Sequence, residues 1–129
     1  MIKYTRVGNS VFAYFDDNYY NQYAYDYWAG DLISYFMKHS SGISSWKITD
    51  AVHDAMHECA ESGMKFYGEA KCHPDDEYSQ AVGEHIAGHR LLDKYLSVRS
   101  RIARRLVKDV SKTHYQLGKI AKTDRKKCW

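Results

Sequence analysis

The stretch that most constrains the fold runs from Lys65 to Arg90, because its hydrophobic period changes halfway along. Small and apolar residues at even positions 64–72 alternate with polar or amphipathic residues at odd positions, which is typical of a half-buried strand. Pro74, the only proline, favours an extended residue before it and so ends the strand. Asp75 or Asp76 is then expected to cap a helix, because acidic side chains are favourable at the positive, N-terminal end of a helix. The segment therefore predicts a strand, a tight turn and a helix in direct succession.

The N-terminal residues predict a partner for this strand. Residues 2–7 and 10–15 are rich in Ile, Val, Tyr and Phe, and Gly8 and Asn9 lie between them. Both residues tolerate a turn with positive φ, so the pattern predicts a β-hairpin. A lone strand at 64–72 must pair, and the hairpin offers an edge. We expect a small antiparallel sheet built from the hairpin and the strand 64–72.

Three further segments have helical spacing. Residues 19–39 carry aromatic stripes at intervals of three and four, with a bend expected near Gly30, and residues 46–60 have one apolar stripe. Ser44 or Ser45 is expected to cap the second of these helices, and Ser62-Gly63 to end it. A third helix is expected from Asp76 to about residue 123, interrupted or bent near one of its glycines. The prediction is an α+β fold with three helices, of which the last is long, amphipathic and basic.

The expected apolar side of the last helix is a near-heptad seam, with the cations on the opposite side. The seam residues are Leu92, Leu96, Ala103, Leu106, Val110, Leu117 and Ile120. The cations roughly opposite are Arg101, Arg105, Lys108, Lys112 and Lys119. A homodimer through this helix is therefore one hypothesis.

Charge is distributed unevenly along the 129 residues. Residues 98–129 carry eleven Lys/Arg and two Asp/Glu, a net of +9, whereas residues 1–97 carry eight and fourteen, a net of −6. The length predicts one domain, residues 1–123, followed by a mobile basic tail, residues 124–129. No apolar run approaches a membrane span, and the N-terminus has no apolar signal core. Three widely spaced cysteines do not suggest a disulfide framework, so the expected location is cytoplasmic.

The strand–turn–helix segment resembles a module found in small phage and mobile-element proteins. The residues that carry the resemblance are Gly68, Ala70, Lys71, Cys72, Pro74, Asp76, Tyr78, Gly83, Ala87 and Arg90. The resemblance implies an architecture in which small residues let the helix approach the strand closely. It implies no catalytic residue, and it covers roughly a fifth of the chain.

Two histidine pairs have the i, i+4 spacing of metal ligands on a helix, His53 with His57 and His85 with His89. The first pair differs from the H-E-x-x-H signature by Asp54, whose shorter side chain reaches a zinc-bound water less well. A tetrahedral site requires the two pairs to face each other, which their wheel positions do not demand. A zinc-dependent hydrolase is therefore a minor alternative, and we expect no cofactor.

Catalysis by a cysteine nucleophile is not indicated either. Cys72 and His73 are adjacent on a strand, so their side chains point to opposite faces. Cys72 is therefore interpreted as a structural cysteine.

The basic residues of the last helix are the main candidates for binding nucleic acid or another acidic partner. They are Arg99, Arg101, Arg104, Arg105, Lys108, Lys112 and Lys119. Such a helix can lie along phosphates and release their counterions. Docking on an acidic protein and a merely solvated helix face are the open alternatives.

A second candidate surface is tyrosine-rich and acidic. Its residues are Tyr19, Tyr20, Tyr23, Asp26, Tyr27 and Asp31. Exposed tyrosines provide large contact areas at low entropic cost, so these residues are candidates for binding a protein. The alternative is that most of the rings build the core.

The favoured hypothesis is a non-enzymatic, phage-type accessory protein that binds a host protein or nucleoprotein complex. An anti-defence inhibitor of a nucleoprotein nuclease, similar in role to anti-CRISPR proteins, is the specific form suggested by the resemblance. Direct binding of DNA or RNA through the basic helix is the first alternative. No membrane partner is expected.

Overall fold

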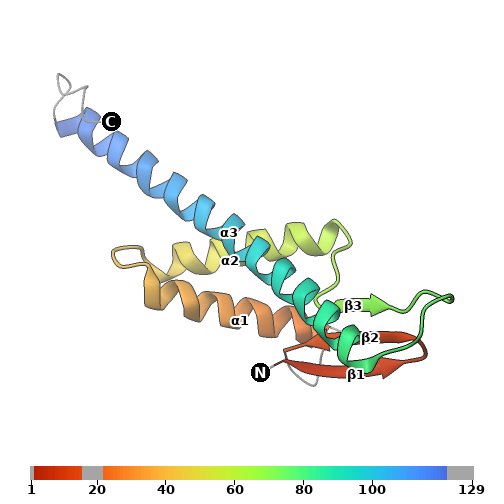
Figure 1. The fold of residues 1–129 in the computed structure, drawn as a ribbon. Coiled ribbons are helices and arrows are strands. Elements are labelled where there is room, and N and C mark those ends of the chain that lie inside the picture. The colour runs from red at the N-terminus through yellow and green to blue at the C-terminus, as the bar shows by residue number, and fades with distance from the viewer. Residues whose placement is uncertain (1, 16–21, 122–129) are drawn as a thin grey trace.

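The computed structural model describes residues 2–15 and 22–121, with the backbone alone for 22–23 and 109–121. Within these residues the elements follow the order β1 (Lys3–Val7), β2 (Ser10–Tyr14), α1 (Gln22–His39), α2 (Ser45–Glu61), β3 (Gly68–Lys71) and α3 (Gln80–Ala121). The predicted α+β class is confirmed, with a three-stranded antiparallel sheet and three helices. Figure 1 shows the sheet at one end of the molecule and α3 running diagonally across the α1–α2 pair.

The hairpin forms as predicted, with the strand order β1-β2-β3. Gly8 and Asn9 make a two-residue turn in which Gly8 has a φ of +62° and Asn9 does not have positive φ. This is the pattern of a hairpin turn with glycine in its first central position. Val11 pairs with Ala70, and Ala13 pairs with Gly68, so small residues of β2 and β3 lie side by side on the face that α3 covers.

The third strand is shorter than the predicted 64–72. Regular pairing covers only Gly68–Lys71, which lies opposite Ser10–Ala13 of β2. The alternation is nevertheless seen in the burial of the side chains: Gly68 and Ala70 are buried, whereas Lys65 and Lys71 are exposed. The hydrophobic period thus identified the correct face but not the length of the strand.

Helix α2 matches its prediction closely. Its apolar stripe is fully buried: Ile48, Val52, Ala55, Met56 and Cys59. Ser44 occupies the N-cap position, although its side chain makes no capping hydrogen bond. At the other end Gly63 adopts a φ of +87°, while the amides of Gly63 and Met64 donate to the carbonyls of Ala60 and Cys59. This pair of bonds satisfies the last carbonyls of the helix, as in a Schellman motif.

Helix α3 begins later than the expected Asp76. Pro74 sits inside a turn that the amide of Asp76 closes by donating to the carbonyl of His73 at 2.9 Å. Ser79 is the residue that caps the helix, because its hydroxyl accepts from the amide of Val82 at 3.3 Å. From Gln80 the helix continues to Ala121 without the interruption considered near Gly83, Gly88 or Gly118. The expected end near residue 123 and the expected mobile tail 124–129 lie outside the described residues.

The buried side of α3 is not the predicted heptad seam. The residues that enter the core are Ala87, Leu91, Tyr95, Val98, Ile102 and Leu106. Leu92 and Leu96 are instead 39% and 43% exposed, and among the seam residues whose side chains are described only Leu106 is buried. Leu92 and Leu96 directly follow the core residues Leu91 and Tyr95, and one position along a helix turns a side chain by about 100°, away from the core side. The side chains of Val110, Leu117 and Ile120 are outside the described set.

Trp28 of α1 is 1% exposed and lies in the core between the layers of the fold. Its ring makes edge contacts with Phe15, Phe66 and Tyr95, at centroid distances of 5.9, 5.2 and 5.3 Å. These contacts tie α1 to the sheet and to α3. Part of the tyrosine-rich region thus builds the core, which was the alternative to a binding surface.

Candidate functional site

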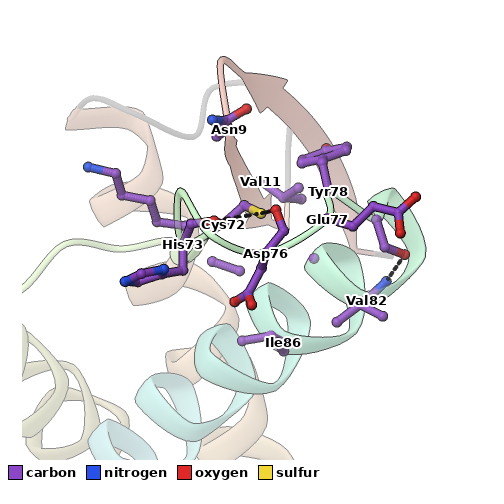
Figure 2. Close-up of a pocket in the computed structure, with 13 residues that line it drawn as sticks. Asn9, Val11, Cys72, His73, Asp76, Glu77, Tyr78, Val82 and Ile86 are labelled. Carbon is purple, nitrogen blue, oxygen red and sulfur yellow. Dashed lines mark hydrogen bonds between the residues drawn. The ribbon is translucent and has the colours of Figure 1, made fainter.

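Two features of the surface are candidates for function, a pocket at the sheet–helix corner and the cations of α3. The pocket has a volume of about 420 Å³ and lies between the turn after β3 and the start of α3. Figure 2 shows Val82 and Ile86 on its α3 side, Asn9 at the hairpin on the opposite side, and Asp76 between them. Val11 and Ala70 add apolar surface from the sheet. Its size falls within the usual range for small-ligand sites.

The thiol of Cys72 and the imidazole of His73, both in this pocket, contact backbone groups. The thiol of Cys72 contacts the carbonyl oxygens of His73 and Asp76 at 3.5 and 3.6 Å. The imidazole of His73 accepts a hydrogen bond from the amide of Asp75 at 3.2 Å. The thiol and the ring are therefore each engaged by backbone, as the alternating directions of strand residues led us to expect. Nucleophilic catalysis requires the thiol and a base to contact each other.

Close packing beside the pocket explains two glycines of the strand–turn–helix segment, Gly68 and Gly83. Gly68 lies against α3, where an added Cβ would be 2.6 Å from the amide nitrogen of Leu91. At Gly83 an added Cβ would be 2.7 Å from a methyl group of Val11. These two glycines let the helix backbone lie on the sheet. The physical content of the motif is thus a close strand–helix contact.

Two side chains of α3 cover the outer edge of β3. Arg90 donates to the carbonyl of Glu69 at 2.7 Å, and Lys94 donates to the carbonyls of Tyr67 and Lys65 at 2.8 and 3.2 Å. Burial lowers the pKa of Lys94, an effect that Glu69 opposes and Arg90 reinforces. Sequence reasoning missed both roles, because pairing between a helix and a strand edge has no local sequence pattern.

The predicted basic residues fall into two groups on α3. Arg101 and Arg105 face α2: Arg105 forms an ion pair with Glu58 and lies 3.8 Å from Asp54, while Arg101 lies 3.8 Å from Glu58. Two carboxylates of the same chain therefore already neutralise these two arginines. Arg99 is also engaged, with its guanidinium 4.4 Å from the ring centroid of Tyr35.

The second group consists of cations without such partners. Arg104 and Lys108 are exposed, and within the described side chains no carboxylate pairs with either of them. Beyond Leu106, the last buried residue of the described core, α3 continues as backbone helix to Ala121 and carries Lys112 and Lys119. Figure 1 shows this distal part extending past the α1–α2 pair. Residues 107–129 contain seven Lys/Arg and two Asp, a net of +5.

The tyrosine-rich surface is only partly described. Tyr19 and Tyr20, together with the side chain of Tyr23, lie outside the described set. Tyr27 is exposed and stacks on Phe15 at 6.3 Å, and Asp26 is exposed. Asp31 is exposed and accepts a hydrogen bond from the hydroxyl of Tyr95, which links α1 to α3.

The histidine pairs do not come together as a metal centre. His53 and His57 are exposed on α2, where His57 contacts Glu61 at 2.8 Å. His85 and His89 are exposed on α3, with ring centroids 4.6 Å apart. In residues 2–15 and 22–108, no group of three or more His, Cys, Asp or Glu side chains could hold a metal ion. The zinc alternative therefore lacks a ligand set in this part of the chain.

Comparisons with protein-family models, with curated proteins and with solved structures find no match to this chain. Among the described helices, none combines the length and the apolar character needed to cross a bilayer.

Proposed function

We propose that this chain is a non-enzymatic binding protein that holds nucleic acid along the distal part of α3. In the wider role that we propose, it is a phage-type accessory protein that acts on a host nucleoprotein, specifically as an inhibitor of a nucleic-acid-guided nuclease. The phage-type assignment is supported by the strand–turn–helix resemblance, and the nucleic-acid contact by the charges of α3.

One observation carries the proposal: some cations of α3 are neutralised by carboxylates of α2, and others have no carboxylate partner among the described side chains. Arg101 and Arg105 are neutralised by α2, whereas Lys108 has no carboxylate partner among the described side chains and is followed by further lysines. An ion pair inside the chain stabilises the fold, whereas a cation without such a partner is available to phosphates. Each phosphate that it neutralises releases counterions, which favours binding at low salt.

Fluorescence anisotropy with labelled duplex DNA and duplex RNA, titrated at several salt concentrations, tests the nucleic-acid contact. The logarithm of the affinity should fall with the logarithm of salt concentration, with a slope of about −0.9 for each phosphate neutralised on B-DNA. The combined variant Lys108→Ala/Lys112→Ala/Lys119→Ala should reduce this slope by about 2 to 3. Absence of binding to both duplexes at low salt contradicts the proposal.

A matched control removes charges that the fold already uses. The variant Arg101→Gln/Arg105→Gln removes two cations from the same helix, but both are held by Glu58 and Asp54. We expect it to retain most of the salt slope and to lose thermal stability, the reverse of the lysine variant. Equal loss of affinity in both variants would show that only total charge matters.

The wider role is tested separately with a purified guided nuclease and its target. We expect the protein to slow cleavage under single-turnover conditions, and the triple lysine variant to slow it less. Cleavage unaffected by an excess of protein excludes inhibition of that nuclease, while the anisotropy result stands independently.

A further inference from the structure

Two histidines near the start of α3 lie beside each other on the side of the helix that faces away from the core. His85 and His89 are both exposed, and their ring centroids are 4.6 Å apart. Their i, i+4 spacing places them on the same side of an α-helix, about 40° from each other around its axis. The core residues Ala87 and Leu91 lie about 200° and 240° around the axis from His85, so both imidazoles are on the solvent side.

Neither of these imidazoles forms an ion pair or a hydrogen bond with another residue in the described part of the chain. Asp93, one turn beyond His89, is exposed and also forms no ion pair among the described side chains. Arg90, the cation next to His89 in sequence, donates to the carbonyl of Glu69 at 2.7 Å and is therefore directed to β3. The ring nitrogens are thus available to a cation, with a carboxylate one turn away.

The separation of the two rings fits two ligands of one metal ion. With a metal–nitrogen bond of about 2.0–2.1 Å, and a ring nitrogen about 1.1 Å from the ring centre, the ion lies about 3.2 Å from each centre. Two rings bound at a right angle then have centres about 4.5 Å apart, and two rings bound at the tetrahedral angle have centres about 5.2 Å apart. The observed 4.6 Å matches the right-angle arrangement.

Only a rotation of the rings is needed to direct one nitrogen of each to the same point. The Cβ–Cγ bond of a histidine points at the ring centre, so rotation about χ2 turns the nitrogens while the centre stays in place. The χ2 torsion of histidine has broad minima, and no hydrogen bond to a described residue fixes it in His85 or His89. Helix α3 therefore sets the spacing of the ligands and leaves their direction adjustable.

We propose that His85 and His89 form a two-histidine site for a divalent transition-metal ion that binds its ligands at right angles, as Cu²⁺ and Ni²⁺ do. Imidazole nitrogen is a suitable ligand for both ions, and Cu²⁺ binds more tightly than Ni²⁺. Water completes the coordination, because the chain supplies only two ligands. This site uses one histidine pair, whereas the zinc alternative required both pairs to face each other.

The site does not depend on the nucleic-acid contact proposed above. His89 and Lys108 are about 28 Å apart along the axis of α3, so an ion at one does not occupy the other. Loss of metal binding and loss of nucleic-acid binding are therefore separate outcomes.

The histidine pair of α2 provides a matched control. His53 and His57 have the same spacing and are also exposed, but the imidazole of His57 contacts Glu61 at 2.8 Å. That ring is directed at a carboxylate rather than at His53. We therefore expect the ion to bind at the pair of α3.

Isothermal titration calorimetry of the full chain with Ni²⁺ tests the site. Ni²⁺ is the probe because, unlike Cu²⁺, it does not oxidise the cysteine thiols of the chain. His85→Gln and His89→Gln should each weaken the binding of one Ni²⁺ per chain about tenfold or more, because one remaining imidazole cannot chelate. His53→Gln/His57→Gln should keep the affinity within about twofold of the parent.

A positional variant tests whether the spacing matters. His89→Gln/Leu92→His keeps the number of histidines on α3, but the two are about 10 Å apart along the axis, too far to share one ion. Its affinity for Ni²⁺ should match that of His89→Gln alone. An affinity equal to that of the parent would mean that any exposed histidine suffices, and would overturn the site.

Chemical denaturation in Ni²⁺ separates a site built by α3 from binding to single histidines. The spacing of His85 and His89 exists only while α3 is helical, so the ion should bind the folded chain. At free Ni²⁺ of about 100 times the Kd, the unfolding equilibrium constant should fall about a hundredfold, and it should not change in His85→Gln/His89→Gln. No binding at millimolar Ni²⁺, or an unchanged affinity in that double variant, overturns the proposal.

Discussion

The Cα of Gly68 in β3 lies directly against the backbone of α3 at Ala87, with no space for a side chain between strand and helix. A Cβ added at Gly68 would overlap the carbonyl oxygen of Ala87 and lie 2.6 Å from the amide nitrogen of Leu91. Both neighbours are helix backbone, which cannot move aside as a flexible side chain can. This contact fixes the distance between the sheet and the helix, and with it the shape of the corner pocket.

Gly68→Ala should therefore destabilise the protein by about 1–3 kcal/mol or more, the usual range for forcing atoms into a packed interior. Gly30→Ala is the control, since a Cβ at Gly30 meets nothing within 4 Å. Gly30 lies inside α1, so alanine should stabilise the helix by about 0.5–1 kcal/mol. Chemical denaturation of the two variants measures both effects. If the Gly68→Ala and Gly30→Ala variants were equally stable, the strand and the helix would be able to separate without cost.

Local patterns predicted much of this fold. The hairpin at Gly8-Asn9 and the ends of α2 depend on residues close in the sequence, and both were predicted near their observed positions. The start of α3 was not, because Asp76 and Ser79 are both good caps and the turn at Pro74 decides between them. The length of β3 depends on where its partner strand ends, which is information from another part of the chain.

The candidate site was less predictable, because it depends on which cations form ion pairs with carboxylates of the same chain. In sequence, Arg101, Arg104 and Arg105 are equivalent members of one basic run. The structure separates them because α2 places Glu58 beside Arg101 and Arg105 and leaves Arg104 exposed. The apolar residues of α3 present the same difficulty: Leu92 and Leu91 have the same chemistry, and only packing shows which of them is in the core.

The ion pairs between α2 and α3 predict a difference between neighbouring arginines. Arg105→Gln should lower the free energy of unfolding by about 0.5–1 kcal/mol, since Arg105 contacts Glu58 and Asp54 in a partly exposed position. Arg104→Gln removes the same charge without removing an ion pair within the chain. Its effect on unfolding, measured on the monomer at low concentration, should be within about 0.5 kcal/mol. The loss at Arg105 should shrink at high salt, where exposed ion pairs are screened.

The covering of the β3 edge predicts a change in solubility. Arg90 and Lys94 donate to the carbonyls of Glu69 and Tyr67, groups that would otherwise be available to a strand of another molecule. Arg90→Ala/Lys94→Ala should cost about 0.5–1.5 kcal/mol for each lost hydrogen bond. It should also increase aggregation on mild heating, measured by light scattering. Lys71→Ala/Lys65→Ala removes two lysines from the same segment without removing a donor to these carbonyls. Similar aggregation of both variants would assign the effect to net charge.

The hydrogen bond from Tyr95 to Asp31 predicts how stability changes in alkaline solution. Burial is the main cause that raises the pKa of Tyr95 well above its ordinary value of 10.0, and the bond to Asp31 adds to it. Burial also raises the pKa of Tyr25, with a contribution from Asp26. Since the folded state keeps these protons longer than the unfolded state, their contribution to stability is complete below pH 10 and decreases as pH rises above it.

Tyr95→Phe should therefore lose about 1 kcal/mol near neutral pH, because the ring contacts with Trp28 and Phe15 remain and only the hydroxyl is removed. Above pH 10 the difference from the parent should narrow, since the phenylalanine variant has no proton to lose at this position. Denaturation at a series of pH values, with tyrosine ionisation followed by ultraviolet absorbance, measures both effects. A difference between the two proteins that stays constant from pH 8 to pH 11 would contradict the assignment, because it would mean that Tyr95 ionises equally in the folded and unfolded states.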